Sequence, residues 1–152
     1  MTSIKRITAL APILAVLAAA PAAAQTGPQP KLPTTPLTIG IHVVQAELAV
    51  TPEQQATGMM FRTSMGTNEG MLFVSQEPGV RCFWMRNTLL PLSIAFIADD
   101  GTIVNTADME PRSEKSHCSA QPVRFALEMN LGWFAKRGIK PGAKISGKPF
   151  RR

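Results

Sequence analysis

The feature that most constrains the fold is a succession of short apolar segments, separated by residues that favour turns. Runs of this length are typical of β-strands, whereas most helices need a longer amphipathic pattern. The clearest run is 123–130, in which apolar side chains alternate with others. Alternation predicts a strand that places Glu128 and Asn130 on the face opposite Leu127.

The same reasoning predicts further strands and two short helices. A helix should start at Thr51, because Thr51 can cap it, Pro52 suits the first helical position and Gln54 completes a capping box. A second helical turn is expected over 131–137. The polar stretch 110–122 is expected to be a loop, because it is too long for a simple hairpin. The other predicted strands are 37–41, 43–50, 71–74, 81–87, 92–97, 102–107 and 143–145. The sequence therefore predicts a mainly β, single-domain sandwich or barrel, jelly-roll-like, with one or two short helices.

The first 24 residues resemble a secretory signal peptide. Lys5 and Arg6 precede an apolar run over 7–20, and Ala22 to Ala24 supply the small residues that signal peptidase reads. The run is shorter than the roughly 20 apolar residues of a membrane-spanning helix. We therefore expect export to the periplasm or the extracellular space, with no membrane span after cleavage.

After residue 24, the proline-rich segment 25–36 is expected to be an extended linker, and 37–150 to be the single folded domain.

Cleavage removes two basic residues, so the net charge falls from +6 to +4. Nucleic acid is not an expected partner, because an exported chain without a recognisable binding motif has no access to it.

Several motifs occur in a fixed order along the chain. They are GMMFR at 58–62, GMLF at 70–73, FWMRNT at 83–88, PL at 91–92, ALEMN at 126–130 and GIKPG at 138–142. In this order they resemble DUF192, a bacterial and archaeal family named as a domain of unknown function. The resemblance implies a compact β-sandwich of roughly jelly-roll type and implies no established activity. The family usually has Lys at position 86 and Asp at position 93, where this chain has Arg86 and Ser93.

The FWMRNT segment is the strongest candidate for a ligand site. Alternation places Trp84 and Arg86 on one face, where the guanidinium can lie against the indole. Other polar side chains could converge there and offer donors to a small anionic or sugar-like ligand. The predicted ligand-binding residues are Arg62, Trp84, Arg86, Asn87, Thr88, Glu128 and Asn130. A structural alternative stays open, in which Arg86 pairs with Glu128 and the Asn87–Thr88 step satisfies backbone groups at a turn.

Nucleophilic and metal chemistry have weaker support. The sequence has no G-x-S-x-G motif, and its two histidines are His42 and His117. His117 and Cys118 are adjacent, and adjacent side chains usually point apart. Metal-binding motifs with known ligand spacing are also missing from the sequence. We therefore predict no catalytic residue, metal or cofactor.

The two cysteines suggest a disulfide. An even number of cysteines in an exported chain favours a bond between Cys82 and Cys118, which would close a loop worth about 4 kcal/mol in the chain-entropy model. A free, buried Cys82 is the alternative.

Two functions of different classes follow from this sequence. One is an exported binding or accessory module of the cell envelope that holds a small anionic or sugar-like ligand, or an envelope component. The other is a small hydrolase or transferase that uses Glu128 and the loop 110–122. A strongly perturbed carboxyl group in a cleft would favour the enzyme.

Overall fold

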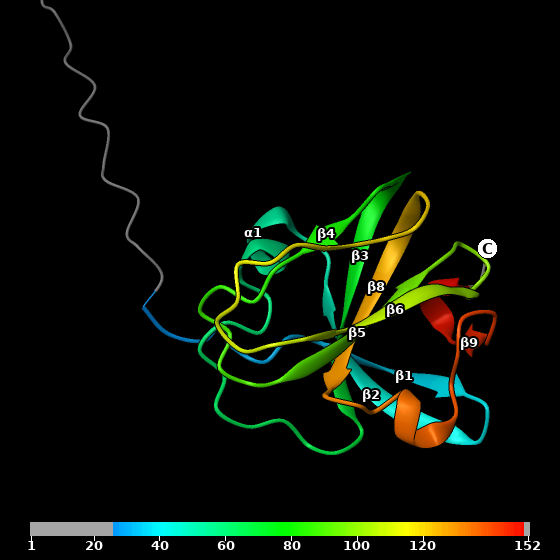
Figure 1. Cartoon of the computed structure of the whole chain (residues 1–152), viewed down its shortest axis with the longest axis horizontal. Coiled ribbons are helices and arrows are strands. Elements are labelled where there is room, and N and C mark those ends of the chain that lie inside the picture. The colour runs from blue at the N-terminus through cyan, green and yellow to red at the C-terminus, as the bar shows by residue number, and fades with distance from the viewer. Residues whose placement is uncertain (1–25, 151–152) are drawn as a thin grey trace, which may run out of the picture.

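The computed structural model describes residues 26–150, so the predicted signal peptide lies outside the described residues. The described part of the chain contains one α-helix, two short 3-10 helices and nine strands, and the predicted mainly β fold is confirmed (Figure 1). The helices are α1 (Pro52–Thr57), η1 (Ala135–Arg137) and η2 (Lys148–Phe150). The strands are β1 (Thr34–Ile39), β2 (His42–Ala49), β3 (Glu69–Gly79), β4 (Cys82–Phe83), β5 (Leu92–Ile97), β6 (Ile103–Met109), β7 (His117–Cys118), β8 (Val123–Asn130) and β9 (Ile145–Ser146).

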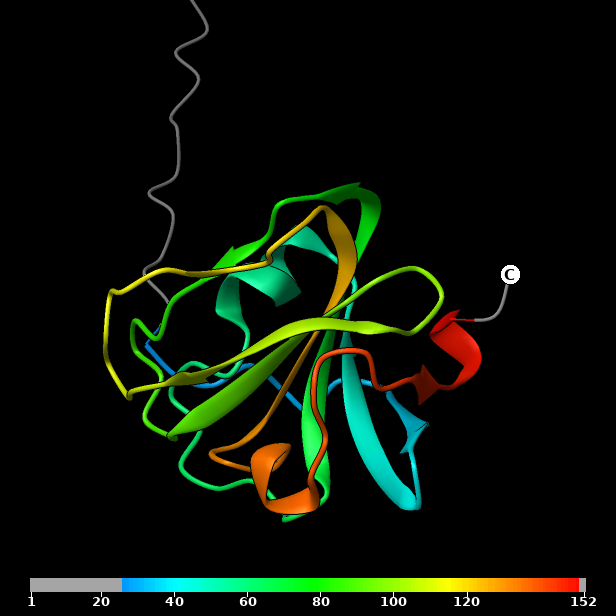
Figure 2. The same cartoon turned by 45° about the vertical axis from the view of Figure 1, so that its right-hand side comes forward.

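Seven of these strands form one curled sheet, in the order β6-β5-β8-β3-β2-β1-β9. All neighbours are antiparallel except β2 and β3, which run parallel because α1 and a long connection separate them. The curl brings the two ends of the sheet together, as Figure 2 shows. There Ile103 N donates to Ala143 O at 2.8 Å and Ile145 N donates to Gly101 O at 2.8 Å. The sheet is therefore a half-barrel whose edges meet at one end.

Gly101 is required where these edges meet. Its φ is +84°, and a Cβ at this position would lie 2.1 Å from the carbonyl oxygen of Ile145. The Asp99-Asp100-Gly101 turn between β5 and β6 is thus also a point of close backbone approach.

The central strands are buried on both faces. Inside the curl, Leu72, Leu127 and Phe125 belong to one apolar cluster that also includes Trp133. On the outer face of the same strands, Met71 and other side chains form a second cluster. Its members are Ala49, Met59, Met71, Phe73, Met85, Leu92, Ile94, Phe96, Met109, Val123 and Ala126. Glu128 alternates with Leu127, so its side chain joins this second face.

The helix α1 covers part of this second face. The predicted capping box is present: Gln54 N donates to Thr51 Oγ1 at 3.2 Å and Thr51 N donates to Gln54 Oε1 at 3.0 Å. The amide of Gln55 donates to Val74 O on β3 at 2.8 Å and to Ala49 O on β2 at 3.3 Å. These bonds fix α1 against the sheet.

The predicted strand over 81–87 is wrong in extent, because only Cys82–Phe83 are extended as β4. The chain then turns: Thr88 N donates to Met85 O at 3.0 Å and Asn87 has a φ of +55°, a conformation that Asn tolerates well. Met85 is fully buried in the second cluster and anchors the turn.

The proline-rich segment is also more structured than expected. Strand β1 already begins at Thr34, and Pro36 is accommodated where β1 has no partner on its other side. Ahead of β1, Leu32 N donates to Glu47 Oε2 at 2.8 Å and the Gln29 amide donates to Gly58 O at 2.9 Å. The part of the segment that the structure describes therefore packs on the domain.

The long stretch Glu110–Pro122 contains the two-residue strand β7, which pairs with β4 alone in a small second sheet. Cys82 and Cys118 are direct partners in this ladder and form a disulfide with an S–S distance of 2.06 Å. The predicted disulfide is confirmed. It ties the stretch to β4, and Asn105 also holds it by donating to Cys118 O at 3.1 Å.

Candidate functional site

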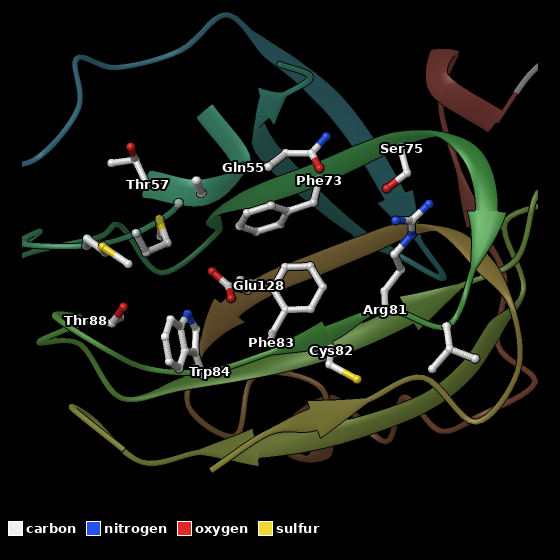
Figure 3. Close-up of a pocket in the computed structure, with 15 residues that line it drawn as sticks. Gln55, Thr57, Phe73, Ser75, Arg81, Cys82, Phe83, Trp84, Thr88 and Glu128 are labelled. Atoms are coloured by element: carbon white, nitrogen blue, oxygen red, sulfur yellow. The ribbon is translucent and has the colours of Figure 1, made fainter. Parts of the chain in front are cut away.

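A cavity of about 380 Å³ opens between α1 and β4, above the outer face of β3 and β8. Figure 3 shows its lining side chains, which come from segments far apart in the sequence. They are Gln55, Ala56, Thr57, Gly58, Met59, Met60, Phe73, Ser75, Val80, Arg81, Cys82, Phe83, Trp84, Thr88 and Glu128. A volume in this range suits a small organic ligand.

Glu128 lies at the centre of this cavity, and its carboxyl group points into it (Figure 3). The residue is only 4% exposed, and its neighbours across the sheet are the apolar Met71 on β3 and Ile94 on β5. Among the described residues its carboxyl has neither a hydrogen-bond donor nor an ion-pair partner. Burial raises the pKa of Glu128 from 4.5 to about 8, so the group is a neutral acid at pH 7.

Arg81 lines the same cavity and lies near Ser75, with the Phe83 ring between it and Glu128 (Figure 3). One terminal nitrogen of its guanidinium donates to Glu77 O at 2.5 Å. Its Nε is buried and has no hydrogen-bond acceptor in the part of the chain that the structure describes. The cavity lining thus contains two groups of opposite potential charge that have no ion-pair partner within residues 26–150.

Aromatic rings form much of the wall between these groups. Phe73 and Phe83 meet edge to face, with ring centroids 4.8 Å apart. Trp84 is 46% exposed, which is high for so large an apolar side chain. The Arg86 guanidinium lies 5.5 Å from the centroid of the Trp84 ring, which is the contact predicted from the sequence.

The structure brings together only some of the residues predicted to bind a ligand. Trp84, Thr88 and Glu128 line the cavity. Arg86 and Asn87 are exposed members of the turn and are not part of the lining. The alternative ion pair between Arg86 and Glu128 is not found among the described residues, because the Arg86 side chain lies outside on Trp84. Asn87 does satisfy a backbone group, since its carbonyl accepts from Phe61 N at 2.8 Å.

Arg62 and Asn130 lie elsewhere. Arg62 makes a two-pronged ion pair with the buried Glu47, at 2.7 and 2.8 Å, which sequence reasoning did not find. The Asn130 amide donates to Gly66 O at 2.9 Å and so fixes the long connection after α1. Neither residue lines the Glu128 cavity.

Sequence reasoning also missed Gln55, Ser75 and Arg81. Arg81 had the clearest signal, because it is a charged residue two positions before the FWMRNT segment and next to Cys82. Nothing in the sequence indicated that α1 would contribute, since its position across the cavity from β4 depends on the tertiary fold.

The described residues offer little for metal or thiol chemistry. They contain no group of three or more His, Cys, Asp or Glu side chains arranged to hold a metal ion. Cys118 is bonded to Cys82 and so cannot act as a thiolate nucleophile. None of the helices within 26–150 has the length and apolar character needed to cross a membrane.

Fold and cavity together define a class of small half-barrel domain with an unpaired carboxyl in a cavity on its outer face. The DUF192 profile, described as "Uncharacterized ACR", matches residues 35–147. The chain belongs to the DUF192 family, as the motifs indicated.

Two solved structures are similar to this chain. A protein of unknown function from Novosphingobium aromaticivorans DSM 12444 is 41% identical, with a TM-score of 0.74 over 83% of this chain and 94% of that one. A protein from Sinorhizobium meliloti 1021, described provisionally as a transcription regulator, is 35% identical, with a TM-score of 0.75 over 80% of this chain and 98% of that one. A search of curated proteins found no match.

Proposed function

We propose that this protein is an exported binding module that holds a small polar organic ligand in the Glu128 cavity. The observation that carries the proposal is the Glu128 carboxyl, which is 4% exposed, faces the cavity and has no partner among the described residues. Buried polar groups in folded proteins almost always have a hydrogen-bond partner. A ligand that fills the cavity would supply the missing one.

Both ligand classes expected from the sequence find suitable groups in the cavity. Arg81 can bind an anionic group. The rings of Phe73, Phe83 and Trp84 can pack against the apolar face of a sugar, while Glu128 and Thr88 can bond to hydroxyl groups. The sequence of residues 1–24 and the Cys82–Cys118 disulfide support a place outside the cytoplasm, where disulfides persist.

The proposal is tested by thermal unfolding of the purified protein with a panel of sugars, small carboxylates, phosphates and zwitterions. A ligand at 100 times its Kd should stabilise the protein by about 2.7 kcal/mol, a shift of several degrees in Tm. Trp84→Ala should reduce the shift, and Leu131→Ala, at an exposed apolar residue outside this cavity, should not. If no compound in the panel gives a saturable shift, the proposal fails.

One observation favours an enzyme as the second candidate. The raised pKa of Glu128, about 8, suits a general acid at neutral pH. However, Arg81 is the other lining residue that ionises, and the loop 110–122 contributes no lining residue. The cavity therefore offers no nucleophile–base pair beside Glu128. Turnover of a bound compound that Glu128→Gln abolishes would favour this candidate over simple binding.

The description of the Sinorhizobium protein raises DNA binding as a further role. We do not adopt it for this chain. A helix-based DNA reader places a recognition helix in the major groove, and the helices within 26–150 are six residues long or shorter.

A further inference from the structure

We propose that the Glu128 cavity takes a zwitterionic ligand, whose ammonium group lies against Glu128 and the aromatic rings and whose anionic group reaches Arg81. This inference rests on the proposed function, because it names the ligand class of the same cavity. It starts from two lining groups that have no ion-pair partner among residues 26–150: the Glu128 carboxyl and the Arg81 guanidinium.

At the Glu128 end, the part of the chain that the structure describes provides no cation. Met71 and Ile94 lie opposite it on the flanking strands, and the charge of Arg81 is not among the causes that set its pKa. Arg86, the next arginine along the chain, lies outside on Trp84. A ligand cation would therefore be the only partner of the ionised carboxylate, in surroundings where an ion pair is weakly screened.

The walls at this end also suit a cation. Phe73, Phe83 and Trp84 are the aromatic members of the lining, and Met59 and Met60 add polarisable sulfur. Aromatic faces attract ammonium groups, most strongly when the groups are quaternary and desolvated. Aromatic rings beside an unpaired carboxylate therefore match a substituted ammonium better than they match an anion.

At the Arg81 end, the requirement is opposite. Arg81 lines this end and has no ion-pair partner among the described residues, and a carboxylate or phosphate oxygen would supply the missing negative charge. A purely anionic ligand would leave Glu128 without a counter-charge, and a purely cationic ligand would leave Arg81 unsatisfied. A neutral sugar could bond to both groups but would pair neither charge. A zwitterion satisfies both ends of the cavity.

Such a ligand links binding to proton release. In the free protein burial keeps Glu128 protonated up to a pKa of about 8, whereas the ammonium group binds the ionised form. Binding below this pKa therefore releases about one proton, and affinity should rise up to tenfold per pH unit from about pH 6 toward pH 8 before it levels.

The test is isothermal titration calorimetry with ω-trimethylammonio carboxylates of increasing chain length, beginning with N,N,N-trimethylglycine. Each zwitterion is matched to the carboxylate in which carbon replaces the ammonium nitrogen; for the first, this is 3,3-dimethylbutanoate. Choline and glucose complete the set. Titration at pH 7 in two buffers of different ionisation enthalpy counts the protons released. We expect one chain length to bind at least tenfold more tightly than its neutral-headed match and to release about one proton.

Two pairs of variants locate the charges. Glu128→Gln should remove the preference for the ammonium group and the proton release, whereas Glu114→Gln, at an exposed carboxylate outside the cavity, should keep both. Arg81→Gln should reduce the advantage of the zwitterion over choline at least tenfold, and Arg137→Gln, also outside the cavity, should not. Circular dichroism checks that each variant is folded.

The outcomes separate this inference from the proposed function. If glucose or the neutral-headed carboxylates bind as tightly as the zwitterions and no proton is released, the inference is overturned and the binding function stands. If none of the zwitterions binds, the inference is likewise overturned, and the broader panel decides the binding function by itself.

Discussion

Replacing Glu128 with glutamine should make the protein more stable at neutral pH, although it changes a buried side chain. Glutamine has nearly the shape of the protonated acid, so packing in the cavity is preserved. The difference lies in the unfolded chain, where Glu128 can ionise and glutamine cannot. In the native protein the carboxyl stays protonated, because burial raises its pKa to about 8.

The size of the effect follows from this pKa. Between the ordinary value of 4.5 and a value of about 8, the unfolded chain has released the proton while the native protein still holds it. Stability therefore falls as pH rises through this window. At pH 7 this window extends over about 2.5 pH units above the ordinary pKa. Each unit lowers the free energy of unfolding by about 1.4 kcal/mol, so the total loss of stability is about 3 kcal/mol. Glu128→Gln should recover this amount at pH 7 and less than about 1 kcal/mol at pH 5.

Urea unfolding followed by tryptophan fluorescence measures both values. With a slope of about 1–3 kcal/mol per M, the midpoint at pH 7 should rise by roughly 1–3 M, and the midpoint at pH 5 should move much less. Glu114→Gln, at an exposed carboxylate, is the matched control and should leave both midpoints nearly unchanged. Equal changes at the two pH values, or a loss of stability at pH 7, would refute the reasoning.

Three further predictions concern other parts of the molecule. Replacing Cys82 and Cys118 with alanine should lower the free energy of unfolding by about 4 kcal/mol, and a reductant should then lower the Tm of the wild-type protein but not that of the variant. Arg62→Met should destabilise the protein by about 3–5 kcal/mol in urea, because Glu47 would stay buried without its partner; adding Glu47→Gln should restore most of the loss, and strictly additive effects would contradict this. The exported protein should begin at Gln25, and N-terminal sequencing that finds residues 1–24 still attached would exclude this.

Local patterns in the sequence were sufficient for most of the secondary structure. Thr51 and Gln54 form their capping box because the bonds involved join residues three apart. Gly138 ends the helical turn expected before it with a φ of +66°, and Ile139 N donates to Phe134 O at 3.0 Å, as in a Schellman motif. Alternation was misleading over 81–87. There the chain turns through Asn87, which has a left-handed conformation, and a two-residue alternation of side chains does not reveal such a turn.

The candidate site was only partly predictable, because part of it depends on contacts between segments far apart in the sequence. The sequence drew attention to Trp84, Thr88 and Glu128, because they occur in motifs and at strand positions with a defined direction. It could not show that Arg62 is committed to Glu47, since that pair depends on how β2 meets the chain after α1. Arg81 likewise became part of the site only through its position in space.

The sequence by itself determined most of the elements: the central strands, where α1 begins and which side of β8 carries Glu128. Those properties depend on neighbours along the chain and on the two-residue period of an extended backbone. Only the tertiary structure decided the chemistry of Glu128. The same alternating position would hold an ordinary exposed carboxylate if the outer face of β8 met solvent. Here α1 and β4 flank the carboxyl group of Glu128, and the described residues provide no counter-charge for it. Removing water from this unpaired carboxyl raises its pKa, and this is what makes Glu128 the centre of the site.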